Sequence, residues 1–194
     1  MKLKKLSRDE VISLFNERLI SDFAKDEIKP LNVIIKAIDD GIYECLGLFE
    51  GEAIVGYTFL VRIGMNYLID YFAVYPTHRN AGIGSHMLSC LSDYLSRACL
   101  IIAEVEDPAY TEDEEAKALQ KRRIEFYKRN GCRDTGLRVR CMGVPFIILE
   151  TENSTSIGKD ALWVTYQSFY KTVLPNEMFE NNIKYLDFIP DSSS

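Results

Sequence analysis

The sequence predicts a mixed α/β (α+β) fold, in which helices cover both faces of a mostly antiparallel sheet of six or seven strands. Two observations lead to this prediction. Three apolar segments at residues 43–49, 53–63 and 67–74 are separated by short turns, as in an antiparallel meander. A strand–helix–strand order follows between residues 67 and 106, which is typical of α/β domains. With 47% hydrophobic residues, the chain has enough apolar side chains for a packed core.

The first elements of the chain are predicted from capping and periodicity. Residues 1–6 fit a short edge strand. Ser7 is followed three residues later by Glu10, which is the spacing of a helix capping box. The helix that starts there carries apolar residues at helical spacing, namely Val11, Leu14, Phe15 and Leu19. A second helix is expected over residues 31–38, before the polar turn that precedes the meander.

The second half of the predicted domain alternates helices and strands. A helix is expected over residues 82–97, and residues 100–106 form an almost wholly apolar strand that should be buried on both faces. Residues 112–130 have an acidic first turn and basic residues toward the end, which matches a helix dipole, and Gly131 is the expected C-cap. Residues 137–142 and 146–151 read as the final strand pair.

The chain beyond residue 151 is predicted to be an appendage. We expect a domain at residues 1–151 and a helical C-terminal extension at residues 152–194. A helix over residues 161–174 carries an aromatic stripe, made of Trp163, Tyr166, Phe169 and Tyr170. Because this stripe is too apolar to be free in water, the extension should pack on the core or on a second subunit.

Composition and charge exclude several classes of protein. The net charge of −6 argues against a nucleic-acid partner, which would require a basic face. The five cysteines include no C-x-x-C pair, so we expect free thiols in a reducing compartment, and neither a disulfide framework nor a metal site. The apolar runs are too short to span a bilayer, and the first residues do not read as a signal peptide. The sequence therefore predicts a cytoplasmic protein without a membrane partner.

The stretch Arg79-Asn80-Ala81-Gly82-Ile83-Gly84 predicts a phosphate site. Two glycines at a helix start let the backbone approach an anion, and the free amides of the first turn point at it. A P-loop is excluded, because its last glycine is followed by lysine and then serine or threonine, whereas Gly84 is followed by Ser85 and His86. A dinucleotide-binding fold would require a small residue at Met87. Such a fold also has an acidic residue about 20 positions after the glycines, and Glu104 lies at about that distance. The dinucleotide-binding alternative therefore stays open, and it predicts that the protein binds NAD.

The same stretch follows a strand that ends Phe72-Ala73-Val74, and this arrangement resembles the acetyl-CoA signature of the GNAT superfamily of N-acetyltransferases. Residues 126–132, Phe-Tyr-Lys-Arg-Asn-Gly-Cys, resemble the second GNAT signature. Cys132 stands where the family has phenylalanine, a departure that concerns packing more than chemistry. The resemblance covers about residues 1–150 and includes the order of elements.

The resemblance implies where coenzyme A would bind. In this superfamily the strands that correspond to residues 67–74 and 100–106 splay apart, and pantetheine enters the gap. Backbone groups of Phe72, Ala73 and Val74 would pair with pantetheine, as an added strand does. The pyrophosphate would be held by the residues of the glycine loop, which are Arg79, Asn80, Ala81, Gly82, Ile83, Gly84 and Ser85.

The resemblance also implies catalytic roles. Tyr127 matches the tyrosine of the second signature and would protonate the leaving thiolate. Glu104 and Glu106 emerge from the end of the apolar strand, and either is a candidate for the base that deprotonates the amine. Asp70 is a third carboxylate, which could anchor the acceptor amine. The backbone N–H of Val74 is the expected donor to the oxyanion.

The function predicted from these features is an N-acetyltransferase. It would move the acetyl group of acetyl-CoA to a primary amine by direct attack in a ternary complex, without a metal. The alternative is a non-catalytic acetyl-CoA-binding module of the same fold, with a sensor or regulatory role. The acceptor is not identified by any motif, and the chain is expected to be a monomer or a homodimer.

Overall fold

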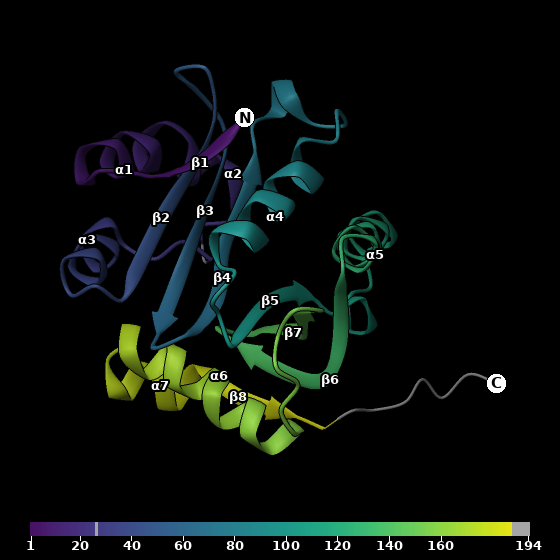
Figure 1. Ribbon diagram of the computed structural model, residues 1–194. Helices are drawn as coiled ribbons and strands as arrows, with labels where there is room; N and C mark the ends of the chain where they lie inside the picture. The colour runs from purple at the N-terminus through teal and green to yellow at the C-terminus, as the bar shows by residue number, and fades with distance from the viewer. Residues whose placement is uncertain (26, 188–194) are drawn as a thin grey trace. The chain divides into compact units, whose positions relative to one another are not determined.

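The computed structural model describes residues 1–25 and 27–187. The chain divides into an N-terminal unit, Met1–Ala98, and a C-terminal unit that begins at Cys99 (Figure 1). Residues 188–194, the end of the expected C-terminal extension, lie outside the described residues.

The N-terminal unit contains four strands in the order β1-β2-β3-β4, and each is antiparallel to its neighbour. The strands are β1 (Lys2–Lys5), β2 (Tyr43–Glu50), β3 (Ala53–Ile63) and β4 (Asn66–Val74). The helices are α1 (Arg8–Leu14), the π-helical η1 (Phe15–Leu19), α2 (Ile20–Asp22), α3 (Leu31–Asp39), the 3₁₀ helix η2 (Pro76–His78) and α4 (Ile83–Tyr94). This is the predicted meander, with the glycine loop between β4 and α4.

The first helix begins as the sequence predicts and then changes its winding. The side chain of Ser7 accepts from the Glu10 backbone at 3.3 Å, and the Ser7 N–H donates to the Glu10 carboxylate at 2.6 Å, which completes the capping box. About two turns later the helix widens into the π-helix η1. Such π segments are frequent at functional sites, and this one carries Arg18, discussed below.

The two faces of the N-terminal sheet have different cores. On one face aromatic rings meet edge to face: Phe23 lies 4.9 Å from Tyr71, and Tyr71 lies 5.9 Å from Phe59. On the other face the side chain of Met87 in α4 packs with Leu48 and Val55, and all three are fully buried or nearly so. Figure 1 shows α1 and α3 on one side of these strands and α4 on the other. The sheet of this unit is therefore covered on both faces, as predicted.

The C-terminal unit also contains four strands, in the order β5-β7-β6-β8, and all neighbours are antiparallel. The strands are β5 (Leu100–Glu106), β6 (Cys132–Cys141), β7 (Val144–Thr151) and β8 (Ile183–Leu186). The helices are the 3₁₀ helix η3 (Pro108–Tyr110), α5 (Glu114–Arg129), α6 (Lys159–Val173) and α7 (Asn176–Asn182). Both α5 and α6 contact β6 (Figure 1).

The predicted fold class is confirmed, with one strand more than expected. The eighth strand, β8, pairs with β6 so that Val139 faces Tyr185, and sequence reasoning gave no strand after residue 151. Helix α6 packs on β6 and β8. The division of the chain into a domain at 1–151 and an extension stays a prediction. So does the splay between β4 and β5, because these strands belong to different units.

Candidate functional site

The glycine loop joins β4 to α4 through two residues with left-handed backbone. Asn80 has φ +65° and Gly82, the N-cap of α4, has φ +76°. A Cβ atom at Gly82 would meet no heavy atom of the described residues within 4 Å, so the backbone is open at this point. Among residues 1–25 and 27–187 no side chain caps α4, and the first helical bond runs from the N–H of His86 to the carbonyl of Gly82. The amides of Ile83, Gly84 and Ser85 therefore open the helix as an anion site would require.

Arg79 is the one charged side chain of this loop, and it is bound to its own loop. Its Nε donates to the backbone carbonyl of Val74 at 3.0 Å. Its Nη2 lies 3.5 Å from a carboxylate oxygen of Asp22, while about half of the Arg79 side chain is exposed. The guanidinium thus holds the end of β4 and still has exposed N–H groups that could meet a phosphate.

The end of β4 directs alternate backbone groups to opposite sides. The Tyr75 N–H donates to Val55 at 3.0 Å, and Val74 lies opposite Gly56. In an antiparallel ladder, hydrogen-bonded and non-hydrogen-bonded pairs alternate. The backbone N–H and C=O of Val74, and by the same alternation of Phe72, therefore point away from β3. Those of Ala73 point toward β3, so the sheet already uses them.

Behind the loop lies a buried carboxylate that sequence reasoning did not single out. The side chain of Asp22 is 4% exposed, and its Oδ1 accepts from Arg18 Nη2 at 2.7 Å. Its Oδ2 accepts from the hydroxyl of Tyr57 at 3.0 Å. Burial, and next the charge of Asp22, raise the pKa of Tyr57. The guanidinium of Arg18 lies 4.8 Å from the ring centre of Tyr75, the residue after Val74.

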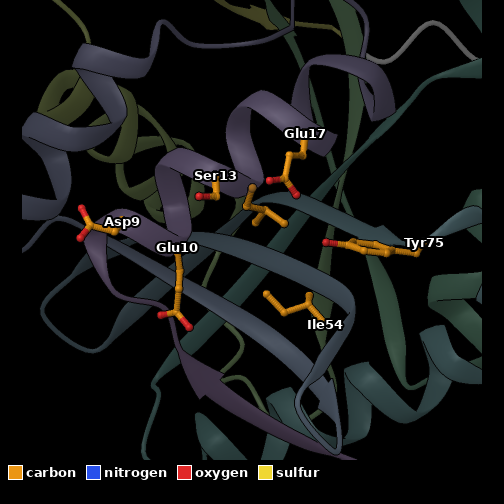
Figure 2. Close-up of a pocket in the computed structure, with 7 residues that line it drawn as sticks. Asp9, Glu10, Ser13, Glu17, Ile54 and Tyr75 are labelled. Carbon is orange, nitrogen blue, oxygen red and sulfur yellow. The ribbon is translucent and has the colours of Figure 1, made fainter.

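A hollow of about 250 Å³ opens beside Tyr75 (Figure 2). It is lined by Asp9, Glu10, Ser13, Leu14, Glu17, Ile54 and Tyr75. Glu10 is already engaged in the capping box of α1. Figure 2 shows Glu17 and Tyr75 on one side of the hollow and Asp9 on the other. The hollow is thus acidic and borders the residue that follows β4.

Asp70, the candidate anchor for an acceptor amine, has a partner within the protein. Its carboxylate accepts from Lys29 Nζ at 2.7 and 2.9 Å, and its side chain is 4% exposed. The neighbouring Tyr71 hydroxyl accepts from the Lys29 N–H and donates to the Glu27 carbonyl, each at 2.9 Å. Asp70 therefore fastens the segment before α3 to β4, and an amine would have to displace Lys29.

The two glutamates of β5 contact different helices of the C-terminal unit. The carboxylate of Glu104 accepts from the hydroxyl of Tyr166 and, at 2.7 Å, from that of Tyr170, both in α6. Glu106 forms an ion pair with Arg123 of α5. Sequence reasoning selected both carboxylates and missed every one of these partners.

Tyr127 lies in the last turn of α5 and is buried, with 9% of its surface exposed. Burial raises its pKa, and the neighbouring Cys132 raises it further. The phenol is therefore protonated at neutral pH, as an acid must be. Two turns earlier on the same face, the buried side-chain carbonyl of Gln120 has no hydrogen-bond partner among the described residues.

The residues selected from the sequence thus fall into two groups. Those from Phe72 to Ser85 lie in the N-terminal unit, and Glu104, Glu106 and Tyr127 lie in the C-terminal unit. Their assembly into one site stays a prediction. Within residues 1–25 and 27–187, no three His, Cys, Asp or Glu side chains are grouped as metal ligands. No helix of that part of the chain is long and apolar enough to cross a membrane.

Comparison with solved structures supports the fold. A Bacteroides thetaiotaomicron protein assigned to the GNAT family has a TM-score of 0.70 and 20% identity, over 88% of this chain and 97% of that chain. An aminoglycoside 6′-N-acetyltransferase complexed with coenzyme A has a TM-score of 0.57 and 13% identity, covering 81% and 99%. The ribosomal-protein-S18-alanine N-acetyltransferase of Escherichia coli has a TM-score of 0.56 and 14% identity, covering 80% and 96%.

The family is indicated by the sequence itself. Among proteins with curated sequences, none matches this chain. The family model described as an acetyltransferase (GNAT) domain matches residues 41–132, from the start of the meander to the end of the second signature. That match includes the glycine loop, both β5 glutamates and Tyr127. Residues 41–132 are thus similar to an acetyltransferase (GNAT) domain, and the chain shares its fold with the solved structures named above.

Proposed function

We propose that this protein transfers the acetyl group of acetyl-CoA to a primary amine, by direct attack in a ternary complex. The observation that carries the proposal is the geometry at the end of β4. Val74 directs its backbone groups away from β3, and the uncapped start of α4 follows at Gly82. The backbone at a strand end can form hydrogen bonds with the amides of pantetheine. The free N–H groups of the helix start that follows can bind the phosphates attached to pantetheine.

The residues of the chain fit coenzyme A at several points. The amides of residues 83–85 and the exposed part of Arg79 would hold the pyrophosphate. The backbone of Phe72 and Val74 would pair with pantetheine. When bound, acetyl-CoA would supply the acetyl thioester.

The chain's own groups would move the protons. Tyr127, kept protonated by burial, is the proposed acid for the leaving sulfur. Glu104 is the proposed base for the amine, directly or through a water molecule. It is favoured over Glu106 because two tyrosine hydroxyls hold its carboxylate, whereas Glu106 is paired with Arg123. The N–H of Val74 is the proposed donor to the developing oxyanion.

One observation favours the alternative, a non-catalytic acetyl-CoA-binding module. Both candidate bases already have partners: Glu104 accepts from two tyrosines and Glu106 is paired with Arg123. A carboxylate held in this way is a weaker base than a free one. The alternative predicts binding of acetyl-CoA without release of free thiol when amines are added.

We propose that the protein acts in the cytoplasm, where its free cysteines would stay reduced and acetyl-CoA would be available. The acceptor is an amine whose identity is open, and the active form is a monomer or a homodimer.

The test of the coenzyme site is Gly84→Val, with Ser89→Val in the same helix as the control. The valine at residue 84 would stand in the first turn of α4, whereas Ser89 is exposed in the second. By isothermal titration we expect Gly84→Val to weaken acetyl-CoA binding at least tenfold, while Ser89→Val binds as the wild type does. Equal affinities in the wild type and a folded Gly84→Val variant would remove the phosphate-cradle argument.

A further inference from the structure

Helix α6 places two hydroxyl donors on one carboxylate of β5. Tyr166 and Tyr170 are four residues apart and so lie on one face of the helix. The hydroxyl of Tyr166 donates to Oε1 of Glu104, and that of Tyr170 donates to Oε2 at 2.7 Å. The two rings are 5.2 Å apart and tilted by 49°. Each oxygen of this glutamate therefore has its own donor, which fixes both the position and the rotation of the carboxylate.

Both tyrosines are part of the core of the C-terminal unit. Tyr166 is fully buried and Tyr170 is 5% exposed. Phenylalanine would bury almost the same apolar surface, so packing alone does not explain the two hydroxyls. Burial raises the pKa of Tyr166 far above its ordinary value, and the charge of Glu104 raises it further. The Tyr166 hydroxyl therefore keeps its proton at neutral pH and can donate it in a hydrogen bond.

Other titratable groups of this unit lie near Tyr166 or follow Glu104 along β5. Cys141 of β6 is close enough to Tyr166 to contribute to its electrostatics. On β5 itself, Glu106 follows two residues later, and Arg123 of α5 offsets its charge. On β7 the residue opposite Glu104 is the apolar Ile148. The two phenols bind the carboxylate directly.

We propose that Tyr166 and Tyr170 are positioning residues that orient the Glu104 carboxylate and keep it ionised, which makes α6 part of the catalytic apparatus. Helix α6 lies outside residues 41–132, the stretch matched by the family model. The inference rests on the proposed function, in which Glu104 is the base. Because O–H donors stabilise the charged form of a carboxyl group, losing one lets the carboxylate take up a proton at higher pH.

The test uses Tyr170→Phe in the full chain, with Tyr185→Phe as the matched control. Tyr185 lies on β8 against Trp163 and is 36% exposed, so its variant loses the same hydroxyl away from Glu104. The Glu104 carboxyl is followed by ¹³C NMR in glutamate-labelled protein, and Glu104→Gln assigns its signal. We expect its titration midpoint to rise by about one pH unit in Tyr170→Phe and to stay unchanged in the control.

Activity gives a second readout. In the pH profile of kcat/KM, the acid limb should move upward by the same amount in Tyr170→Phe, so that the loss approaches roughly tenfold at pH values below the midpoint and is small on the plateau above it. A Tyr170→Phe variant with a lower melting temperature, but with an unshifted titration and acid limb, would leave the tyrosines as packing residues and overturn the inference. Tyr166→Phe repeats the test at the other oxygen if Tyr170→Phe does not fold.

The two proposals fail in different ways. If the NMR midpoint shifts but the wild type transfers acetyl to no amine, the proposed function is wrong and the control of Glu104 ionisation by α6 stands. If the wild type transfers acetyl to an amine, but Tyr166→Phe and Tyr170→Phe both leave the NMR titration midpoint of Glu104 and the acid limb unchanged, the proposed function stands and this inference is wrong.

Discussion

The Nε of Arg79 donates to the backbone carbonyl of Val74 at 3.0 Å, so the arginine of the glycine loop fixes the end of β4 relative to the loop. The same guanidinium reaches toward Asp22, which is bound to Arg18 and Tyr57. The candidate anion site is therefore tied to the helices at the start of the chain, and the shape of the loop depends on contacts that the loop sequence does not contain.

Replacing Arg79 should weaken coenzyme binding through the shape of the loop. Arg79→Lys keeps the charge but removes the Nε bond to Val74. A hydrogen bond of this kind contributes about 1 kcal/mol, so we expect acetyl-CoA affinity to fall roughly fivefold in isothermal titration. Arg62→Lys is the control, because the Nε of Arg62 holds the carbonyl of Gly64 in the same manner, away from the loop. Equal losses in both variants would refute a specific role for Arg79.

Asp22 should matter for stability. Asp22→Asn leaves Arg18 without its carboxylate partner in a mostly buried position. We expect a loss of about 2 kcal/mol in the free energy of unfolding, measured with urea. The control is Asp40→Asn, which breaks the exposed pair with Lys36 and should cost less than about 0.5 kcal/mol. If the two variants unfold alike, the Asp22 contacts contribute no more than a surface pair.

Asp134 should make the stability of the protein depend on pH in the acid range. Burial raises its pKa, but hydrogen bonds from Arg138 and from the Gly136 N–H outweigh this and hold the pKa below its ordinary value. A depressed pKa in the folded state stabilises the protein above the unfolded value near 4, and this contribution is lost as pH falls through the folded pKa.

The measurement compares Asp134→Asn with the wild type in urea at pH 7 and at pH 3. We expect the variant to be less stable by about 1 kcal/mol at pH 7, since the carboxylate is partly exposed, and the difference to shrink at pH 3. A difference that is constant across this range would show that the charge of Asp134 is not the cause.

Tyr127 should control turnover without controlling binding. Tyr127→Phe removes a hydroxyl from a buried ring, so we expect unchanged acetyl-CoA affinity and a loss of kcat of roughly 10²–10⁴. From the sequence alone, a phenol-dependent alkaline limb is expected in the pH profile. Because burial raises the pKa of Tyr127, that limb should lie at a higher pH than an ordinary phenol would give. A variant with wild-type kcat, where chemistry limits the rate, would make Tyr127 a packing residue.

The sequence predicts the elements whose signals are local. Strands β3 and β5 have the bounds expected from their apolar runs, and the capping box of Ser7 and Glu10 forms as expected. The π-helix at Phe15–Leu19 is missed because one extra residue in a turn hardly changes an apolar pattern. The short strand β8 is missed because its partner β6 lies more than 40 residues earlier, and pairing at that distance leaves no periodic signal.

In the candidate site too, the sequence predicts residues with local motifs and misses contacts between distant segments. The glycine loop and Tyr127 could be selected because their residue types follow known signatures. The partners of Glu104 are 62 and 66 residues away, and nothing in the sequence assigns the stripe of α6 a role beyond packing. Likewise, Asp22 lies in a polar stretch without a motif, and only the fold brings it to Arg79.

The most direct test of the central claim is the release of free thiol from acetyl-CoA in the presence of a panel of amines, with acetyl-CoA binding measured in parallel. We predict saturable binding, and thiol release that requires both an amine and the hydroxyl of Tyr127. Binding without amine-dependent thiol release in any member of a broad panel would favour the non-catalytic module. The absence of any acetyl-CoA binding by the folded protein would contradict the account as a whole.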